Sequence, residues 1–591
     1  MGANPAQAQP AAVSPRPFAF TVQIKAPQAV HDYLQRHLDL QRYREVTDLD
    51  KQELARLLTA AERNARELLG TLGYFSPEIR IAPRDTPEST ASARDVLITV
   101  DPGMPTRIGA VEIAFSGPIA SDSAAAAQRA AIQNDWQLRP GQPFTQAAWE
   151  DAKAGALRAL TARRYPTGEL ALSRADIDPD TRTANLSLTL ASGPAYRFGP
   201  LQIDGMKRYD PELVERLARF PSGDEYDQAR MLEAQQRLAD SGYFDSVFVT
   251  LDTQGDPQAA PLVVQLREAT LQKLVLGVGI STDGGPRLSV EHTHRKLPLL
   301  GWRALTKLSL DRATQSASTE LTAPPDADNW RWIASGLLQR QDSGSFKVTS
   351  QRLRGGRSWT TERLDRSYYL QYDRAHTAGD GVAETADAVS ANYAWTERHF
   401  DSLLFPASGH GLAVELGGGI TLGSSREPYG RVLARWLGYR PFGEVRADSG
   451  AIRKSRLALR AEGGAVVARD RAQIPDTQLF VTGGDSTVRG YGYRDIGTQL
   501  PGDKVTAGRY LAVGSVEWQR PFVHNGRFTD WESTLFIDAG AVADKPRNLR
   551  AKVGIGAGAR WRSPVGPLQV DLAYGVQEKS LRLHLSVGFT F

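Results

Sequence analysis

The chain has 591 residues, with 71 basic and 67 acidic side chains, a formal net charge of +4 and no cysteine. Its length suits several domains, and because the charges form no long basic run, a nucleic-acid-binding surface is not expected. The lack of cysteine excludes disulfides, cysteine-based metal sites and thiol nucleophiles, and it suits an oxidising compartment such as the bacterial periplasm.

The amino-terminal residues up to about Pro17 are rich in alanine and proline. They lack the charged start and the apolar core of a complete signal peptide, but the Ala-Gln-Ala triplet at Ala6–Ala8 resembles the end of one. We therefore expect residues 1–17 to be a flexible lead, with the numbering beginning at or near a mature terminus.

The next part of the chain contains three similar segments, which repeat about every 80–90 residues. The sequence around Tyr74, GTLGYFSPEIRI, recurs as ADSGYFDSVFVTL around Tyr243, and Tyr165 takes the equivalent place between them. Residues 103–113 and 193–203 also resemble one another and mark the junctions between segments. The predicted domains are residues 18–104, 105–194 and 195–269.

Each segment is predicted to fold in the order β-α-α-β-β. In the third segment, apolar residues at three- and four-residue spacing predict helices in PELVERLARF and DQARMLEAQQRLADSG, and two alternating strands follow. Gly73 and Gly242 stand where a glycine commonly ends a helix. The second segment departs from this pattern, because Arg-Arg-Tyr-Pro replaces Gly-Tyr-Phe.

This tandem arrangement resembles the POTRA domain, the polypeptide-transport-associated domain. The resemblance implies a small sheet with helices on one face and an edge strand that is free to pair with an extended client or partner peptide. The alternative interpretation is that the three segments are only spacers.

From about Leu271 the pattern changes to strands and turns, with no convincing helical stretch. Residues 553–561, 568–576 and 581–591 alternate between apolar and polar or small side chains, so one face suits lipid and the other a polar lumen. No run of eighteen apolar residues predicts a transmembrane helix. About 20 residues per strand and connection predict about sixteen antiparallel strands within residues 270–591. A soluble β-sandwich would also explain the alternation, but not an aromatic final strand behind POTRA-like repeats.

Two motifs in this second half resemble those of the BamA/TamA superfamily of outer-membrane assembly proteins and their two-partner secretion relatives. The residues are Val488, Arg489, Gly490 and Tyr491 in a loop, and Phe536, Asp538 and Gly540 in a strand. The resemblance implies that the loop folds back into the barrel and that Arg489 contacts Asp538. An inward carboxylate in a narrow lumen favours a cationic partner, and a guanidinium group can bind it bidentately. The pair could equally serve only to brace the barrel.

Residues 277–287, GVGISTDGGPR, resemble the first barrel strand and turn of the same superfamily. Because this strand is rich in glycine, we expect its pairing with the last strand to be weak, as a lateral gate would require. The predicted gate residues are Leu276, Val278, Ile280, Leu585, Val587, Phe589 and Phe591. A short but permanently closed seam is the alternative.

No catalytic, cofactor-binding or metal site is predicted. His292 and His294 are near neighbours, but no third ligand is evident, and the glycines at 554, 556 and 558 lack the strand-turn-helix context of a nucleotide loop. No phosphate-binding loop, nucleophile elbow or zinc-protease motif occurs. We therefore expect no enzymatic activity, with a dispersed esterase or protease triad as the open alternative.

The resemblance implies a barrel in the bacterial outer membrane with the repeats in the periplasm. Three repeats favour the TamA-type branch of the superfamily, since BamA-type members have five and two-partner secretion transporters have two. The implied partners are a TamB-like periplasmic protein, unfolded autotransporter-type outer-membrane proteins as clients, and outer-membrane lipid. The expected function is client insertion through the lateral gate; the alternatives are a polypeptide export pore and phospholipid transport with TamB.

Overall fold

The computed structural model describes residues 20–46, 49–84, 95–379, 382–402, 405–448, 450–563 and 566–587. The predicted lead and the predicted gate residues Phe589 and Phe591 lie outside these ranges. The chain divides into two compact units. The first comprises Met1–Asp204, Phe220–Arg237 and Val247–Leu266, and the second comprises Gly205–Arg219, Leu238–Ser246 and Arg267–Phe591.

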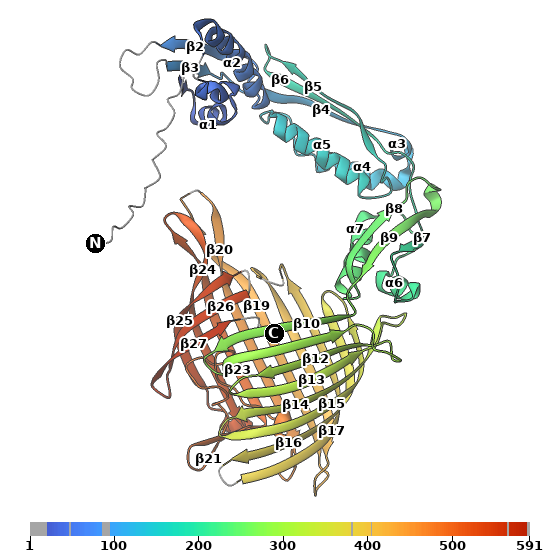
Figure 1. Cartoon of the computed structure of the whole chain (residues 1–591), viewed down its shortest axis with the longest axis vertical. Coiled ribbons are helices and arrows are strands. Elements are labelled where there is room, and N and C mark those ends of the chain that lie inside the picture. Colours follow the sequence, from blue (N-terminus) through green and yellow to red (C-terminus); the bar gives the residue numbers. More distant parts are fainter. Residues whose placement is uncertain are drawn as a thin grey trace, which may run out of the picture. The chain divides into compact units, whose positions relative to one another are not determined.

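The first repeat contains a three-stranded sheet with the order β1-β3-β2 (Figure 1). Its elements are β1 (Thr21–Lys25), α1 (Gln28–His37), η1 (Asp39–Glu45), α2 (Lys51–Thr71), β2 (Glu78–Arg84) and β3 (Asp95–Asp101). β1 and β3 run parallel, whereas β2 and β3 run antiparallel. Asp50 caps α2 by accepting a 2.7 Å hydrogen bond from the backbone N–H of Glu53. Leu34, Leu69 and Ile98 lie in the apolar core.

The second repeat has the sheet order β4-β6-β5 and one additional short helix. Its elements are β4 (Arg107–Ser116), α3 (Pro118–Ser121), η2 (Ser123–Ala125), α4 (Ala126–Asn134), α5 (Gln146–Thr161), β5 (Glu169–Asp178) and β6 (Thr183–Ala191). The hydroxyl of Thr145 caps α5 by accepting a 3.2 Å hydrogen bond from the backbone N–H of Ala148. Ile119, Leu160 and Tyr165 are buried in the core.

The third repeat has the sheet order β7-β9-β8. Its elements are β7 (Phe198–Asp204), α6 (Pro211–Ala218), α7 (Gln228–Asp240), β8 (Phe244–Leu251), η3 (Pro257–Ala259) and β9 (Ala260–Glu268). The predicted order β-α-α-β-β is therefore confirmed, with an extra helix in the second repeat. None of the described helices combines the length and the apolar composition that crossing a membrane requires.

In all three repeats, the residue before the aligned tyrosine has a left-handed backbone. The φ angle is 90° at Gly73, 58° at Arg164 and 77° at Gly242. Glycine adopts this conformation freely, but a residue with a side chain is strained there. Arg164 forms ion pairs with Asp122 (3.0 Å) and Glu225 (2.6 Å), which hold it in place. The second repeat therefore keeps the turn without the glycine, and for this reason its sequence looks divergent.

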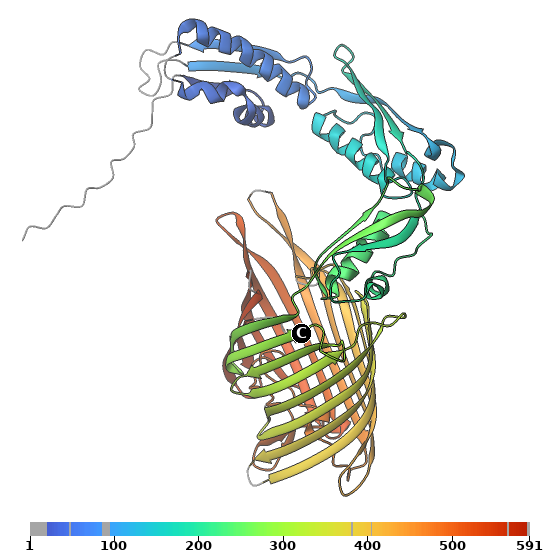
Figure 2. The same ribbon diagram turned by 45° about the vertical axis from the view of Figure 1, so that its right-hand side comes forward.

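The second half of the chain is an antiparallel barrel (Figures 1 and 2). It is closed and has sixteen strands within the part of the chain that the structure describes. The strands are β10 (Gln272–Ser281), β11 (Gly285–His294), β12 (Arg303–Leu310), β13 (Thr314–Thr322), β14 (Trp330–Ser343), β15 (Phe346–Thr360), β16 (Leu364–Gly379), β17 (Val382–Phe400), β18 (Gly409–Thr421), β19 (Pro428–Arg446), β20 (Ile452–Ala468), β23 (Tyr510–His524), β24 (Arg527–Ala543), β25 (Lys552–Ser563), β26 (Gly566–Gly575) and β27 (Ser580–Val587). The predicted fold class is therefore confirmed.

Side chains alternate between the two faces of the barrel wall. On β24, Leu535 and Ile537 are exposed on the outside, whereas Phe536 and Asp538 are buried on the inside. The outer face is apolar and the inner face carries the buried charges, which is the pattern that a membrane barrel requires.

The connection between β20 and β23 does not extend away from the barrel. It contains η4 (Asp476–Gln478), β21 (Thr498–Leu500) and β22 (Lys504–Thr506). Val488, Tyr491 and Ile496 from this connection share one apolar cluster with the wall residues Val466 and Val513. The connection therefore packs against the inner wall and occupies part of the lumen.

Candidate functional site

Arg489 lies at the centre of the connection between β20 and β23, in a segment that we call the arginine loop (residues 483–497). Its guanidinium group donates two hydrogen bonds to the Asp538 carboxylate, from Nε (2.7 Å) and from Nη2 (3.0 Å). The Arg489 backbone N–H donates a third, of 3.1 Å, and the Ser515 hydroxyl donates a fourth, of 2.6 Å. Arg489 is 4% exposed and Asp538 is 0% exposed, so this bidentate ion pair is closed off from solvent.

Arg489 also contacts two carboxylates on neighbouring strands. Its Nη1 donates to Glu517 of β23 (2.6 Å) and to Asp571 of β26 (3.0 Å). Arg560 of β25 donates to the same two groups, at 2.8 Å and 2.5 Å. We call Arg489, Glu517, Asp538, Arg560 and Asp571 the arginine–carboxylate cluster.

A third guanidinium group balances the charge of this cluster. Arg460 of β20 is half-buried beside it and donates to the backbone carbonyls of Ser486 and Thr487, the latter at 2.6 Å. Burial alone would lower the pKa of Arg489, but the hydrogen bonds and negative charges of the surrounding carboxylates raise it above its usual value. Arg489 is therefore always protonated, and three guanidinium groups neutralise three carboxylates.

Phe536, the first residue of the predicted strand motif, supports the same side chain. The Arg489 guanidinium carbon lies 3.4 Å from the centre of the Phe536 ring, which is a cation–π contact. Tyr491 is fully buried, and its hydroxyl donates to the carbonyl of Val553 (3.0 Å). Both aromatic residues of the two motifs therefore fix the loop to the wall.

The loop lies directly on three glycines of the inner wall, Gly540, Gly554 and Gly575, which we call the glycine track. A Cβ atom at Gly554 would lie 1.8 Å from the Arg489 carbonyl oxygen, and one at Gly575 would lie 2.5 Å from that of Gly490. A Cβ atom at Gly540 would lie 2.5 Å from a methyl carbon of Val488. Only glycine allows this close approach.

The described part of the seam between β10 and β27 is short. Among the described residues, the register contains one pair, Ser281 opposite Ser586, whereas β10 pairs with β11 along its entire length. Two further hydrogen bonds join Thr282 and Leu585: the Thr282 backbone N–H donates to the Leu585 carbonyl (3.2 Å), and the Leu585 backbone N–H donates to the Thr282 hydroxyl (3.1 Å).

The predicted gate residues of β10 lie on the outer face beside this seam. Leu276, Val278 and Ile280 are exposed, Val278 to 85%. Leu585 is half-buried and accepts the hydrogen bond from Thr282. Val587 lies opposite Leu568 in the register with β26.

The arginine loop contacts both sides of the seam. On the side of β27, the Gly490 backbone N–H donates to Nε2 of the buried His584 (2.9 Å). On the side of β10, the Asp283 carboxylate in the turn after this strand accepts a hydrogen bond from the backbone N–H of Asp485 (2.7 Å). The loop is therefore placed to bridge the first and last strands.

Sequence reasoning identified Arg489 and Asp538 but missed the partners Glu517, Arg560 and His584. A signal was available, because each of these residues occupies an inward position of an alternating strand, where an ionisable side chain needs a partner. Within the described ranges, no group of histidine, aspartate and glutamate residues is arranged to hold a metal ion. His292 is instead 3.1 Å from the side-chain oxygen of Gln272.

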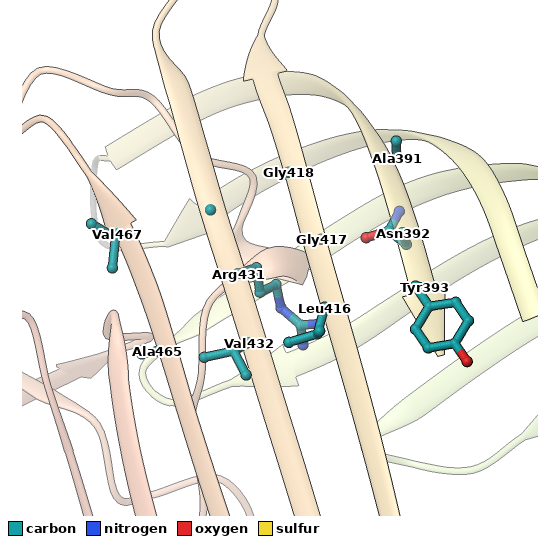
Figure 3. Close-up of a pocket in the computed structure, with 11 residues that line it drawn as sticks. Ala391, Asn392, Tyr393, Leu416, Gly417, Gly418, Arg431, Val432, Ala465 and Val467 are labelled. Atoms are coloured by element: carbon teal, nitrogen blue, oxygen red, sulfur yellow. The ribbon is translucent and has the colours of Figure 1, made fainter. Parts of the chain in front are cut away.

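A depression of about 570 Å³ lies on the wall formed by β17 to β20 (Figure 3). It arises where the small residues Ala391, Gly418 and Gly430 lie in register between larger neighbours such as Tyr393 and Leu416. The lining is mostly apolar, as expected for a surface that faces lipid.

Residues 302–591 match the Omp85 superfamily domain, and residues 196–269 match the POTRA family described as a surface antigen variable number repeat. The outer membrane protein assembly factor BamA of Nitratidesulfovibrio vulgaris is 24% identical over 416 residues, covering 66% of this chain and 50% of that protein. BamA of Neisseria meningitidis serogroup B is 22% identical over 590 residues, covering 88% of this chain and 71% of that protein.

The chain thus spans about half the length of one of these curated relatives. Among solved structures, BamA from Haemophilus ducreyi lacking POTRA domains 1–3 superposes with a TM-score of 0.61 and 16% identity, over 82% of this chain and 100% of that one. This similarity shows a common fold. The chain therefore contains a POTRA domain at residues 196–269 and an Omp85 superfamily barrel domain at residues 302–591.

Proposed function

We propose that this chain is an outer-membrane protein assembly factor that inserts client β-strands into lipid through the seam between β10 and β27. The barrel would lie in the outer membrane, with the POTRA-like repeats in the periplasm. The relatives named as outer membrane protein assembly factors support this proposal. The observation that carries it is that a single described register pair closes the seam, while the arginine loop contacts both of its strands.

The physical reason is the cost of unpaired backbone groups in lipid. An N–H or C=O group without a partner costs several kcal/mol in the hydrocarbon region. A client strand that pairs with the seam side of β10 would satisfy its own groups and those of β10 together. The exchange is favourable in itself and needs no nucleotide.

The cluster suits a barrel that opens at one place only. Arg489 connects β23, β24 and β26 through Glu517, Asp538 and Asp571, so the wall leading to β27 is braced from inside. The contact with the β10 side runs through Asp485 and Asp283. Opening at the seam would therefore leave the braced wall unchanged.

We extend the proposal to the TamA-type branch, with a TamB-like periplasmic partner and autotransporter-type clients. Three sheets with helices before the barrel support this extension. Polypeptide export through the lumen, or phospholipid transport with the same partner, are the competing functions. The buried side chains of Val488, Arg489 and Tyr491 inside the barrel favour insertion at the seam over passage through the lumen.

The test uses single cysteines, since the chain has none of its own. Val278→Cys should form disulfides with cysteines in the terminal strand of a client during its assembly in cells. Leu416→Cys is the matched control, because Leu416 is also apolar and exposed on the outer face, but on β18. Crosslinks only from an inward position such as Ser350→Cys would support export through the lumen, and equal yields from Val278→Cys and Leu416→Cys would contradict the seam.

A further inference from the structure

The turn between β11 and β12 presents apolar side chains to the exterior. Its sequence from Leu297 to Trp302 is Leu-Pro-Leu-Leu-Gly-Trp. Leu299 is fully exposed and Leu300 is 58% exposed. Two adjacent leucines exposed to water at the tip of a tight turn are unfavourable, because hydrating their apolar surface costs free energy.

The conformation of this turn is defined and strained. The backbone N–H of Leu297 donates to the Trp302 carbonyl (2.8 Å), and that of Gly301 donates to the Leu297 carbonyl (2.9 Å). Leu299 has a φ angle of 68°, which a bulky side chain rarely adopts. The chain therefore holds a leucine in a costly conformation that displays it outward, and such strain is typical of a functional position.

The turn continues the surface that faces lipid. Trp302 has the same strand parity as Leu308 and Leu310, which are exposed on the outer face of β12. It also shares a cross-strand register row with Trp332 of β14, because the register places it opposite Ala323, whose backbone N–H donates to the Trp332 carbonyl (2.8 Å). Trp332 is exposed and Trp302 is half-buried, and tryptophans at strand ends are typical of the boundary between bilayer and water.

The base of the same turn is fixed to the segment that leads into the barrel. Arg295 Nε donates to the Gly242 carbonyl (2.7 Å). Lys296 donates to the Arg208 carbonyl, and its ammonium group lies 5.3 Å from the centre of the Tyr209 ring. All these residues belong to the barrel unit. A contact that fixes the tip of the turn would therefore also fix the position of residues 205–219 and 238–246.

We infer that residues 297–302 form a shallow membrane anchor, in which Leu299 and Leu300 enter the leaflet on the periplasmic side. Trp302 lies at the level of the headgroups, and Arg295 and Lys296 transmit the position of the anchor to α6 and to the loop around Gly242. The occupant of this surface is lipid, because the turn is continuous with the outer face of β11 and β12. The inference rests on the proposed membrane location of the barrel.

The test measures the depth of a label in the bilayer. The full chain carrying Leu299→Cys is labelled with a small fluorophore and reconstituted in nanodiscs that contain lipids brominated near the headgroup end of the acyl chains. We expect quenching at least half as strong as that of Val278→Cys, which lies on the outer face of β10. Met104→Cys is the matched control for an exposed apolar residue outside the barrel, and it should not be quenched.

The controls separate the inference from the proposed function. If Val278→Cys is not quenched, the membrane location of the barrel is wrong. If Val278→Cys is quenched but Leu299→Cys behaves like Met104→Cys, the anchor is refuted and the turn is left as a docking site for a protein. A second variant, Leu299→Asn with Leu300→Asn, should increase amide exchange in residues 205–219 in nanodiscs and leave Val278→Cys quenching unchanged; unchanged exchange would contradict the anchoring role.

Discussion

At the scale of single residues, the buried Asp538 decides how the arginine loop is held. Its carboxylate accepts hydrogen bonds from Arg489 and Ser515, and neither Asp538 nor Arg489 is accessible to water. Breaking a buried ion pair by removing one partner costs about 3–5 kcal/mol, because the other charge is left uncompensated. Removing both partners avoids that cost.

The pair therefore predicts strong energetic coupling. Arg489→Ala and Asp538→Ala should each destabilise the protein by several kcal/mol, and the double variant should cost less than their sum by about 0.5–3 kcal/mol. Thermal unfolding in detergent measures the stability of the three variants relative to the wild-type protein. The exposed ion pair of Arg435 and Glu462 (2.9 Å) is the control, and its coupling should stay below about 1 kcal/mol. Additive effects at Arg489 and Asp538 would show that the pair is not coupled.

Asp485 makes the docking of the loop depend on pH. Burial and, next to it, the nearby Asp283 carboxylate together raise the pKa of this carboxyl group from its usual 3.8 to about 7. A raised pKa in the docked loop means that docking is most stable below about pH 4, where both states are protonated. As the pH rises from about 4 to about 7, the carboxyl group ionises in the undocked loop but stays protonated in the docked loop. Ionisation therefore favours the undocked state, and this contribution to stability is lost by about pH 7.

Wild-type protein should accordingly lose thermal stability between about pH 4 and about pH 8, and Asp485→Asn should flatten that dependence. The neutral amide keeps the shape of the side chain without the ionisation. The readout is the melting temperature of the barrel, together with protease cleavage within residues 483–497. Parallel pH profiles for the two proteins would rule out Asp485 as the titrating group.

At the scale of elements, the glycine track determines where the loop can lie. Gly554→Ala should push the loop off the wall, because the new Cβ atom would lie 1.8 Å from the Arg489 carbonyl oxygen. Overpacking of this kind typically costs about 1–3 kcal/mol. Gly514→Ala is the matched control, since that strand glycine has nothing within 4 Å of its Cβ position. Protection of the loop against protease should fall in Gly554→Ala and not in Gly514→Ala. Equal protection in the two variants would mean that the barrel wall shifts to accommodate the new Cβ atom.

The alternation along each strand was sufficient to predict the barrel, the approximate strand number and the inward direction of Asp538. The position of the loop on the wall was not predictable in the same way. Gly554 and Gly575 belong to different strands, and their shared role emerges only when the register of β25 and β26 brings them beneath Arg489 and Gly490. In a single sequence, a glycine within a strand could equally indicate the close approach of another group or a bend in the strand.

The partners of Arg489 were hidden for a related reason. Glu517, Asp571 and Arg560 lie on three different strands, and local periodicity shows that each points inward but not which of them meet. Their meeting depends on the stagger between neighbouring strands, which irregularities such as the bulge between Pro521 and Val523 modify. A tertiary register of this kind leaves no signal in a short window of sequence.

At the scale of the whole molecule, the barrel combines a braced wall with a seam whose described part is one register pair long. The cluster connects β23 to β26 from the inside, and the loop reaches β27 through His584 and the end of β10 through Asp283. Insertion through the seam requires that the contact between β10 and β27 separates while the rest of the wall persists. A covalent bond across the seam should therefore abolish the function without affecting the fold.

Ser281 and Ser586 provide the site for such a bond, because they lie directly opposite one another in the register. Opposite residues of antiparallel strands have Cα atoms about 4.5–5.5 Å apart, within the range that a disulfide spans. Ser281→Cys with Ser586→Cys should stop client insertion when oxidised and restore it when reduced.

The matched control is another opposed serine pair, Ser358 and Ser367, which lies where β15 and β16 are paired along their length. A disulfide there stiffens the barrel equally but closes no seam, so client insertion should continue in the oxidised protein. Insertion is measured as the yield of folded client in reconstituted vesicles. If the oxidised Ser281–Ser586 variant inserts clients as well as this control, they do not pass between β10 and β27, and the seam is a permanent closure.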